Sequence, residues 1–257
     1  MDKPRIRCEI RDGIAEVMLT RGDKLNALDR AMFGAIDETL NQLERQKGLR
    51  AVILHGEGRA FCAGLDVKSM LRQPVAALEI LRREADEATN LAQRVAYGWH
   101  QLPAPVIAVT QGGCFGGGLQ IALGADFRFS TPDCRFSVME IKWGIIPDMS
   151  GSVTLRNLMG VDVAMELAMS GRELDAQEAR ALGLVSRVCE DPLDAAREFA
   201  RTLITKSPDA LAGIKQLYHQ AWARSDEVML KEETRLQQQI LGRPNQWRAT
   251  LNSLFRW

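Results

Sequence analysis

Three consecutive glycines at 116–118 separate an apolar run typical of a buried strand from an apolar run typical of a helix. Glycine leaves backbone N–H groups open because it has no Cβ, and the start of a helix adds partial positive charge. Such a turn holds a phosphate or a developing oxyanion, or it lets a helix pack closely against a sheet. Two more glycines, at 112 and 113, precede the run, and packing alone seldom requires so many. The pattern therefore favours a functional turn within an α/β fold.

The residues after the glycines exclude the two common nucleotide-binding loops. A phosphate-binding loop continues with Lys and then Ser or Thr, whereas Leu119 and Gln120 follow here, and the spacing GxGxxG is absent. A second turn of small residues, RAFCAGLD at 59–66, ends another strand-to-helix connection. Two such turns, each offering one backbone N–H, predict an oxyanion hole with two donors.

Composition and charge indicate an ordinary soluble globular protein. The chain has 257 residues, of which 46% are hydrophobic and 26% charged. Lys plus Arg equals Asp plus Glu at 33 each, so the balance gives no sign of a nucleic-acid partner. No apolar run has the length of a membrane span, and none near the N-terminus has that of a signal peptide.

Cysteine and histidine usage indicates the compartment and argues against a metal site. The five cysteines are scattered, odd in number and never spaced as CxxC, so we expect reduced thiols in a cytoplasmic protein. None of the three histidines lies near an acidic cluster in the sequence, so no metal centre is expected.

Strand-like and helix-like runs alternate over the first half of the chain, and the last third is helical. Hydrophobic patterning predicts strands at 14–20, 50–56, 105–112, 125–131 and 135–138, and helices at 28–46 and 75–99. Asp175 with Glu178, and Ser207 with Pro208, are helix-start signals. Repeated ββα or βαβ units explain this order. We expect a core at 1–195 and a helical region at 196–257 that serves as a lid or an oligomerisation arm.

Five motifs, in this order along the chain, resemble the crotonase family, the enoyl-CoA hydratase/isomerase superfamily. They are NALD at 26–29, FCAGLD at 61–66, GGGLQIALGADFRF at 116–129, EIKWGIIPD at 140–148 with the Ser-Gly pair that follows, and GRELDAQEARALGLVSRV at 171–188. The resemblance implies an α/β fold, a crotonase-like spiral of ββα repeats with a helical C-terminal region. It also implies an acyl-CoA thioester substrate, with CoA as part of that substrate and no separate cofactor, and a homotrimer or dimer of trimers.

Motif by motif, the resemblance assigns the oxyanion donors to the backbone N–H groups of Leu65 and Gly117. CoA is expected along two loops, at Lys24, Leu25, Ala27, Ala63, Asp66, Val67 and Lys68. An isolated surface lysine is often merely solvated, so this reading stays open for the two lysines. Lys215, in the helical region, is a weaker candidate for a CoA phosphate.

The catalytic positions depart from the family pattern. Family hydratases use two glutamates, and the first of those positions is Gln120 here while the second is Glu140. A glutamine side chain hydrogen-bonds water or substrate but does not accept a proton near neutral pH. Asp148 matches an acidic position of dienoyl-CoA isomerases within the same family. The alternatives are a solvated Glu140 at a strand end and a helix cap at Asp148.

The favoured hypothesis is therefore an isomerase that shifts a double bond of an unsaturated acyl-CoA with Glu140, together with Asp148, as acid and base. The close competitor is an enoyl-CoA hydratase, a lyase, that uses Glu140 with a water held by Gln120. Other enolate chemistries of the family, such as thioester hydrolysis, decarboxylation and ring closure, also remain open. From a different class, a non-catalytic CoA-binding or RNA-binding relative that kept the fold is a further alternative. Trp143 and Met149 belong either to an acyl pocket or to the core.

Overall fold

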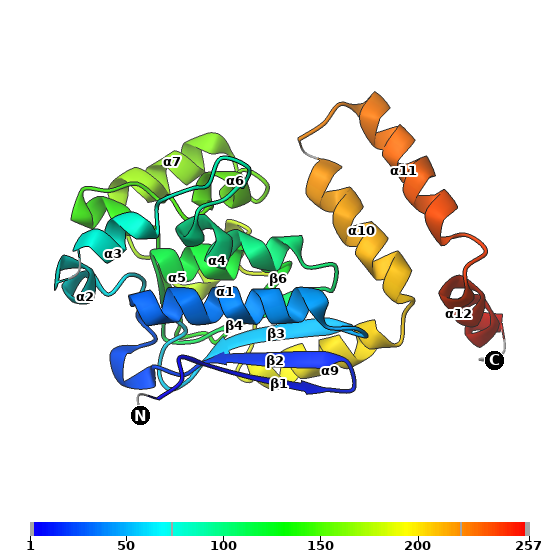
Figure 1. Cartoon of the computed structure of the whole chain (residues 1–257), viewed down its shortest axis with the longest axis horizontal. Coiled ribbons are helices and arrows are strands. Elements are labelled where there is room, and N and C mark those ends of the chain that lie inside the picture. The colour runs from blue at the N-terminus through cyan, green and yellow to red at the C-terminus, as the bar shows by residue number, and fades with distance from the viewer. Residues whose placement is uncertain (1–2, 73, 222, 255–257) are drawn as a thin grey trace.

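The computed structural model describes residues 3–72, 74–221 and 223–254. Within these ranges a six-stranded sheet runs through the body of the molecule (Figure 1). The strand order is β1-β2-β3-β4-β6-β8, with β1 antiparallel to β2 and every other pair parallel. Their bounds are β1 (Ile6–Arg11), β2 (Ile14–Leu19), β3 (Ala51–Gly56), β4 (Val106–Thr110), β6 (Phe127–Ser130) and β8 (Arg187–Val188). Two short strands, β5 (Gly113–Phe115) and β7 (Arg135–Ser137), form a second parallel sheet.

Helices cover both faces of the large sheet (Figure 1). On one face α1 and α4 pack over a core that includes Phe33, Leu54 and Trp99, and on the other α9 buries Ala196 and Ala200. β3 and β4 are buried along their whole length, which explains their continuous apolar runs. The helical elements of the body are η1 (Gly22–Lys24), α1 (Arg30–Arg45), α2 (Val67–Arg72), α3 (Pro74–Glu79), α4 (Leu91–Gln101), α5 (Gly117–Leu123), η2 (Glu140–Trp143), α6 (Gly151–Leu155), α7 (Val161–Ser170), α8 (Ala176–Ala181) and α9 (Pro192–Ile204).

The predicted single helix at 75–99 is wrong. α3 ends at Glu79, and a new helix, α4, begins at Leu91 behind a capping box: Gln93 N–H donates to Asn90 Oδ1 at 2.8 Å, and Asn90 N–H donates to Gln93 Oε1 at 3.1 Å. Residues 82–89 are all exposed or nearly so and carry no apolar stripe, so no packing energy holds them in a helix. The capping signal at 90–93 was the local cue for this break.

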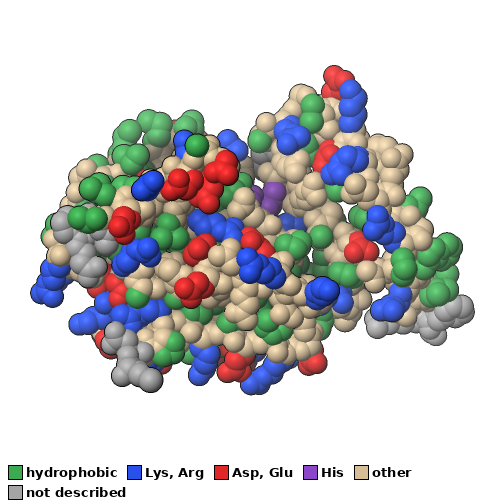
Figure 2. All heavy atoms as spheres, in the orientation of Figure 1, with side chains coloured by type: hydrophobic (Ala, Val, Ile, Leu, Met, Phe, Trp, Pro, Cys, Tyr) green, Lys and Arg blue, Asp and Glu red, His purple; other side chains and the backbone are tan. Residues whose placement is uncertain are grey.

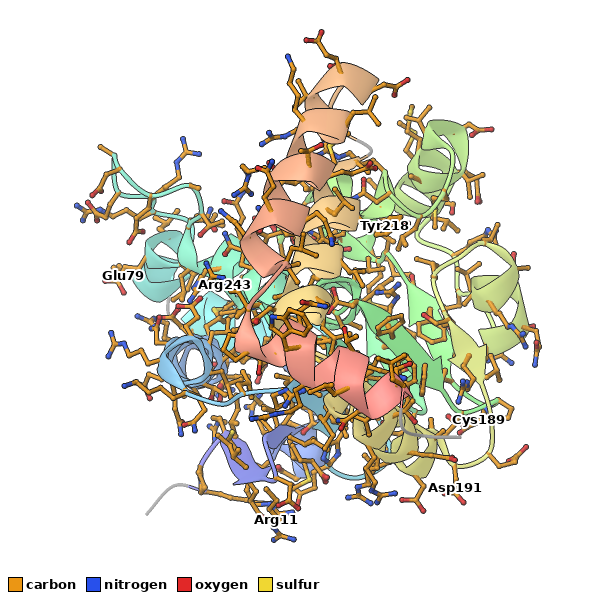
Figure 3. The ribbon with its side chains drawn as sticks, turned by 90° about the vertical axis from the view of Figure 1, so that its right-hand side faces the viewer. Arg11, Glu79, Cys189, Asp191, Tyr218 and Arg243 are labelled. Atoms are coloured by element: carbon orange, nitrogen blue, oxygen red, sulfur yellow. The ribbon has the colours of Figure 1, made fainter. Side chains whose placement is uncertain are left out.

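Three helices form an arm that leaves the body, namely α10 (Pro208–Ala221), α11 (Asp226–Ile240) and α12 (Pro244–Leu254) (Figure 1). Figure 3, seen from the side of the arm, shows Tyr218 on α10 and Arg243 in the turn between α11 and α12. The expected boundary between residues 195 and 196 falls inside α9, whose buried alanines join that helix to the sheet. The arm therefore begins after Ile204. No helix in the described ranges is long and apolar enough to cross a bilayer.

Buried charges fasten the arm to the body at α10. Lys215 Nζ lies 2.9 Å from Asp126 Oδ2 and donates to the carbonyl oxygens of Trp99 and Ala104, while His219 Nε2 lies 2.9 Å from Asp126 Oδ1. Burial alone would raise the pKa of Asp126, but His219 and Lys215 outweigh it and lower that pKa. The Lys215 ammonium is fully engaged within its own chain, so the weak prediction that it meets a CoA phosphate is wrong.

The same junction makes stability depend on pH through His100, which stacks on His219 at 3.5 Å between ring centroids. Figure 2 shows histidine atoms in the hollow between the body and the arm. Burial first, and then the nearby His219, lower the pKa of His100 from 6.5 to about 4. Between these values the unfolded chain holds a proton on His100 that the folded chain does not, so acidification through this window favours unfolding.

We therefore expect the free energy of unfolding to fall as the pH drops from 6.5 to about 4. In His100→Phe, which keeps the stack but cannot titrate, about 1–2 kcal/mol of this fall should disappear, after discounting for the partial exposure of the ring. Urea unfolding of both proteins at the two ends of the window measures the difference. Equal pH dependence in the two proteins would contradict the assignment.

Candidate active site

The two small-residue turns lie against each other at the carboxyl ends of β3 and the β4–β5 segment. Phe115 N–H donates to the carbonyl oxygen of Cys62 at 3.0 Å, and Cys62 N–H donates to that of Gly113 at 3.1 Å. Gly64 has a φ of +84°, and a Cβ there would lie 2.8 Å from the Phe115 oxygen and 3.5 Å from the Gly117 nitrogen. Only glycine allows this approach, and the approach brings the two predicted donor turns together.

The two N–H groups predicted as oxyanion donors are open. Gly117 is the first residue of α5, where a backbone N–H has no partner within the helix. The residues on either side of Leu65 both bond to the main chain of Leu28. Leu28 N–H donates to the Gly64 oxygen at 2.8 Å, and Asp66 N–H donates to the Leu28 oxygen at 3.0 Å. Within the described part of the chain, neither N–H donates to a main-chain acceptor. This pair is what an oxyanion hole requires.

The glycine run serves both packing and access. A Cβ on Gly118 would lie 2.6 Å from the carbonyl oxygen of Cys62, so this position needs glycine for close packing alone. Gly116 has a φ of +50°, and a Cβ there would point at Glu140, 3.4 Å from its Oε1. The start of α5 is thus open toward the Glu140 carboxyl group.

Glu140 is buried, with 6% of the residue exposed, at the start of η2. Its Oε1 accepts a hydrogen bond from Gln120 Nε2 at 2.5 Å, whereas its buried Oε2 has no hydrogen-bond partner among the described residues. Burial raises the pKa of Glu140, and the nearby charge of Asp148 adds to the rise against the opposing hydrogen bond from Gln120. The alternative of a solvated residue at a strand end is wrong, and Oε2 is available for a proton.

Gln120 holds Glu140 and the following turn in place. Its Oε1 accepts from the N–H groups of Met149 and Gly151, each at 2.9 Å, while its Nε2 donates to Glu140. The amide oxygen therefore has both lone pairs occupied, and among the described residues only one of the two amide hydrogens is bonded. This buried side chain therefore links the residues next to Asp148 to the carboxyl group of Glu140 through hydrogen bonds.

Asp148 is half-buried, and burial raises the pKa of its carboxyl group. The helix that follows, α6, begins at Gly151 with Ser150 as its N-cap residue, so Asp148 does not occupy the cap position. Its charge is close enough to Glu140 to raise that residue's pKa. Two carboxyl groups with raised pKa values thus lie within electrostatic reach of each other, as an acid and a base working on one substrate require.

The residues predicted to bind CoA surround these turns. Lys24 and Lys68 are exposed, and the intermediate exposure of Leu25, Ala27, Ala63 and Val67 leaves part of each on the surface. Asp66 differs, because its carboxylate is engaged by Arg21 at 2.8 Å and by the N–H of Ser69 at 3.1 Å. Any contact of Asp66 with CoA therefore falls to its main chain.

Nearby apolar residues and cysteines divide between core and surface. Met149 is buried over the start of α5, whereas Trp143 is 60% exposed. Cys62 and Cys114 are fully buried, and burial raises the pKa of Cys62 to about 12 and that of Cys114 well above its ordinary value. Both remain thiols at neutral pH, which excludes them as nucleophiles.

The described ranges contain no group of three or more side chains able to hold a metal ion.

Two residues support these turns through contacts that the sequence did not predict, although Asn26 belongs to the NALD motif. Asn26 is fully buried, and its side chain accepts from Arg21 N–H and donates to the carbonyl oxygens of Glu57 and Ala60. Asn26 and Leu25 both adopt positive φ, at 55° and 52°, so these bonds hold an otherwise unfavourable turn. For Arg21 no local pattern exists, because its partner Asp66 comes 45 positions later.

The spiral α/β fold, with two open amides beside a buried carboxyl group, defines a protein of the crotonase class. The chain belongs to the enoyl-CoA hydratase/isomerase family, whose model matches residues 9–246. It is 32% identical over 251 residues to the 1,2-epoxyphenylacetyl-CoA isomerase of Escherichia coli K12, covering 96% of this chain and 94% of that protein.

Of two further similar proteins, one is named an isomerase and the other a hydratase. The mitochondrial Delta(3,5)-Delta(2,4)-dienoyl-CoA isomerase of Mus musculus is 32% identical over 216 residues, 79% of this chain and 64% of that protein. The crystal structure of enoyl-CoA hydratase from Thermoplasma volcanium GSS1 superposes with a TM-score of 0.86 at 28% identity, covering 99% of this chain and 98% of that one. Similarity at this level fixes the family, while the reaction has to be argued from the site.

Proposed function

We propose that this protein is an acyl-CoA isomerase that shifts a double bond of an unsaturated acyl-CoA thioester. The observation that carries this proposal is Gln120. It occupies the position of the first glutamate in the two-glutamate mechanism, and its amide oxygen already accepts from two main-chain N–H groups. One buried carboxyl group, Glu140, then remains beside the two open amides. This set suits removal and return of a carbon-bound proton more than addition of water.

In the proposed reaction, the Glu140 carboxylate removes a proton from the carbon next to the thioester carbonyl. The electron pair moves to the carbonyl oxygen, and the N–H groups of Leu65 and Gly117 stabilise the resulting enolate. Asp148, in its protonated form, delivers a proton to a carbon farther along the chain, and the electrons return to re-form the carbonyl. Raised pKa values suit both steps, since they make the carboxylate a stronger base and keep an acid protonated at higher pH.

The alternative, an enoyl-CoA hydratase, requires an activated water. In this site Gln120 has one amide hydrogen, unbonded among the described residues, for the oxygen of a water, and Glu140 would have to serve as both base and acid. Relatives of nearly equal identity carry both names, isomerase at 32% and probable enoyl-CoA hydratase at 31%, so the proposal rests on the site and not on the names. The non-catalytic reading is disfavoured by a buried, partnerless carboxylate oxygen at the site.

Binding and assembly follow the same proposal. Lys24 and Lys68 are both exposed, which supports the expectation that they meet CoA phosphates as point charges. The arm exposes large apolar side chains that an assembly of several copies would cover, which supports the expected trimer. They include Tyr218, Leu230, Leu241, Trp247 and Leu254.

A panel of 2-enoyl-, 3-enoyl- and 3,5-dienoyl-CoA thioesters tests the proposal. We expect the purified protein to convert a 3-enoyl or 3,5-dienoyl thioester into a product of unchanged mass with the double bonds conjugated to the carbonyl, measured by mass spectrometry and ultraviolet absorbance. If the addition of one water to a 2-enoyl thioester is faster than every other conversion, the protein is a hydratase instead. Tight binding of CoA without turnover of any thioester would establish the binding protein.

A further inference from the structure

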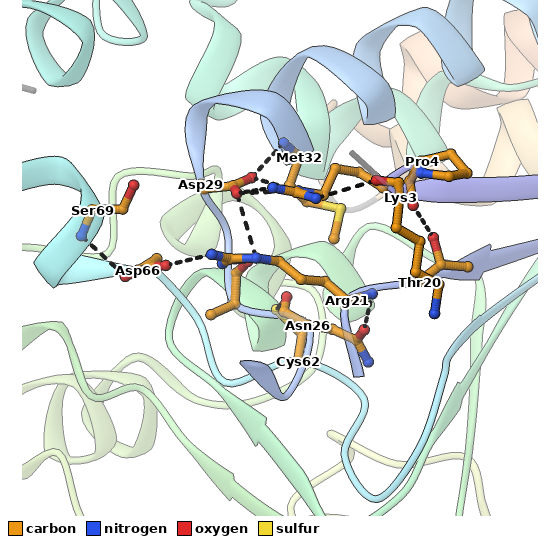
Figure 4. A network of polar contacts seen from close by, with 12 residues as sticks. Lys3, Pro4, Thr20, Arg21, Asn26, Asp29, Met32, Cys62, Asp66 and Ser69 are labelled. Carbon is orange, nitrogen blue, oxygen red and sulfur yellow. Dashed lines mark hydrogen bonds and ion pairs between the residues drawn. The ribbon is translucent and has the colours of Figure 1, made fainter. Parts of the chain in front are cut away.

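We infer that Arg21 is a positioning residue for the oxyanion hole. Its side chain links the loop at residues 24–27, here called the CoA loop, to the turn that carries the Leu65 N–H. This inference rests on the proposed function and adds to it the group that sets one donor. Arg21 follows β2 and precedes η1, and Figure 4 shows it between the carboxylates of Asp29 and Asp66.

Every polar part of Arg21 is used. One terminal nitrogen, Nη2, lies 2.8 Å from Asp66 Oδ2, the other donates to the carbonyl oxygen of Ala27 at 2.8 Å, and Nε lies 3.4 Å from Asp29 Oδ2. Its backbone N–H donates to Asn26 Oδ1 at 2.9 Å. The side chain is only 13% exposed. One arginine therefore joins the CoA loop, the start of α1 and the turn before α2.

Asp66 transmits this contact to Leu65. Its carboxylate is fixed at both oxygens, by Arg21 and by the N–H of Ser69. On the main chain, Asp66 N–H and the Gly64 oxygen both bond to Leu28. The peptide units on either side of Leu65 are therefore held, while its own N–H donates to no acceptor among the described residues. Without Arg21, the Asp66 side chain loses one of its two anchors, and the direction of the Leu65 N–H depends on the main-chain bonds to Leu28 alone.

The charges of the network balance only as a set. Two arginines, Arg5 and Arg21, alternate with Asp29 and Asp66, and the side chains of all four are 10–22% exposed. Burial alone would raise the pKa of Asp66, but the N–H of Ser69 and the Arg21 guanidinium lower it. Loss of Arg21 leaves two partly buried carboxylates close together, so repulsion would move the Asp66 turn as well as release it.

Initial rates with the best thioester of the panel test the inference in four proteins: wild type, Arg21→Ala, Arg21→Lys and Arg94→Ala. Arg94 is a matched control, since its side chain is 18% exposed and its Nη2 and Nε contact Glu44 at 2.7 Å and Asp37 at 3.4 Å, both on α1. We expect kcat of Arg21→Ala to fall about 10- to 100-fold, as misplacement of a reacting group does, and to fall by a larger factor than the affinity for CoA itself, which Arg21 supports only through its bond to the Ala27 oxygen.

Arg21→Lys keeps one charge and should recover part of kcat, whereas Arg94→Ala should lower Tm and leave kcat unchanged. If Arg21→Ala does not fold, Asp66→Asn removes the charge pair at its other end and should lower kcat about tenfold. An active wild type whose kcat is unaffected by these changes, or falls equally in Arg94→Ala, would overturn the inference alone. A wild type that turns over no thioester would overturn the proposed function, and the inference with it.

Discussion

Gly117→Pro is expected to lower kcat by about 100- to 1000-fold, the usual cost of removing one donor from an oxyanion hole, or about 2.7–4 kcal/mol of barrier. Proline has no N–H to offer the thioester oxygen. Its fixed φ suits the first position of a helix, where Gly117 stands, so helix α5 itself tolerates the change better there than in its interior. Initial-rate kinetics on the best substrate measure the loss.

Gly117→Ala is the matched control, because it keeps the N–H and adds only a Cβ. That Cβ would lie 2.7 Å from Met149 Sδ, the flexible part of a methionine side chain, so some crowding but no loss of the donor is expected. The difference in kcat between the proline and alanine variants therefore removes the effect of the Cβ and leaves that of the lost N–H together with the proline ring. Equal losses in both variants, or full activity in a folded proline variant, would be incompatible with a donor at this position.

Glu140→Gln is the second change with a large expected effect, a fall in kcat of about 100- to 10,000-fold, the range for loss of a general acid or base. The amide is isosteric, and its oxygen still accepts from Gln120 Nε2 as Oε1 does now, so the fold should be retained. Glu166→Gln, at an exposed residue on α7 that pairs with Arg172, should leave kcat unchanged. Undiminished turnover in Glu140→Gln would remove this residue from the mechanism.

The pH profile of the wild type gives a further check on Glu140. The proposed base must be ionised, and burial raises its pKa above the ordinary 4.5 of a glutamate. As the pH falls, the Glu140 carboxylate is therefore protonated earlier than an exposed glutamate would be. The acid limb of kcat should lie above the pKa of an ordinary glutamate and should be absent from the residual activity of Glu140→Gln.

Hydrophobic periodicity predicted the sheet and much of its helical cover. β2, β3, β4 and α1 were located from patterns whose cause is burial, which the structure confirms along β3 and β4 and along one face of α1. β1 was missed because only alternate residues of it touch the core and its charged residues face solvent. The break between α3 and α4 was missed because alanine-rich, charged sequence has a high helix propensity, whereas residues 82–89 have no packing contact that would hold them in a helix.

The candidate site was predictable in its parts that recur as motifs, and not in the contacts that join them. Leu65, Gly117 and Glu140 were proposed from the resemblance, and the structure brings their turns together. The role of Gln120 was not predictable, because its partners are main-chain N–H groups of residues 149 and 151, which no side-chain pattern identifies. In the hydratase alternative Gln120 holds a water, and this role stays a prediction, while the amide oxygen accepts from those two groups.

Heavy water offers the most direct measurement of the proposed reaction. The protein is incubated in deuterium oxide with 3-enoyl and 3,5-dienoyl thioesters and with the matching 2-enoyl thioester, and products are analysed by mass spectrometry with fragmentation. We expect a shifted double bond, deuterium at the newly formed C–H and no added water, with the conversion lost in Glu140→Gln. Addition of a whole deuterium oxide to the 2-enoyl thioester, with no shift of the double bond in the others, would contradict the isomerase.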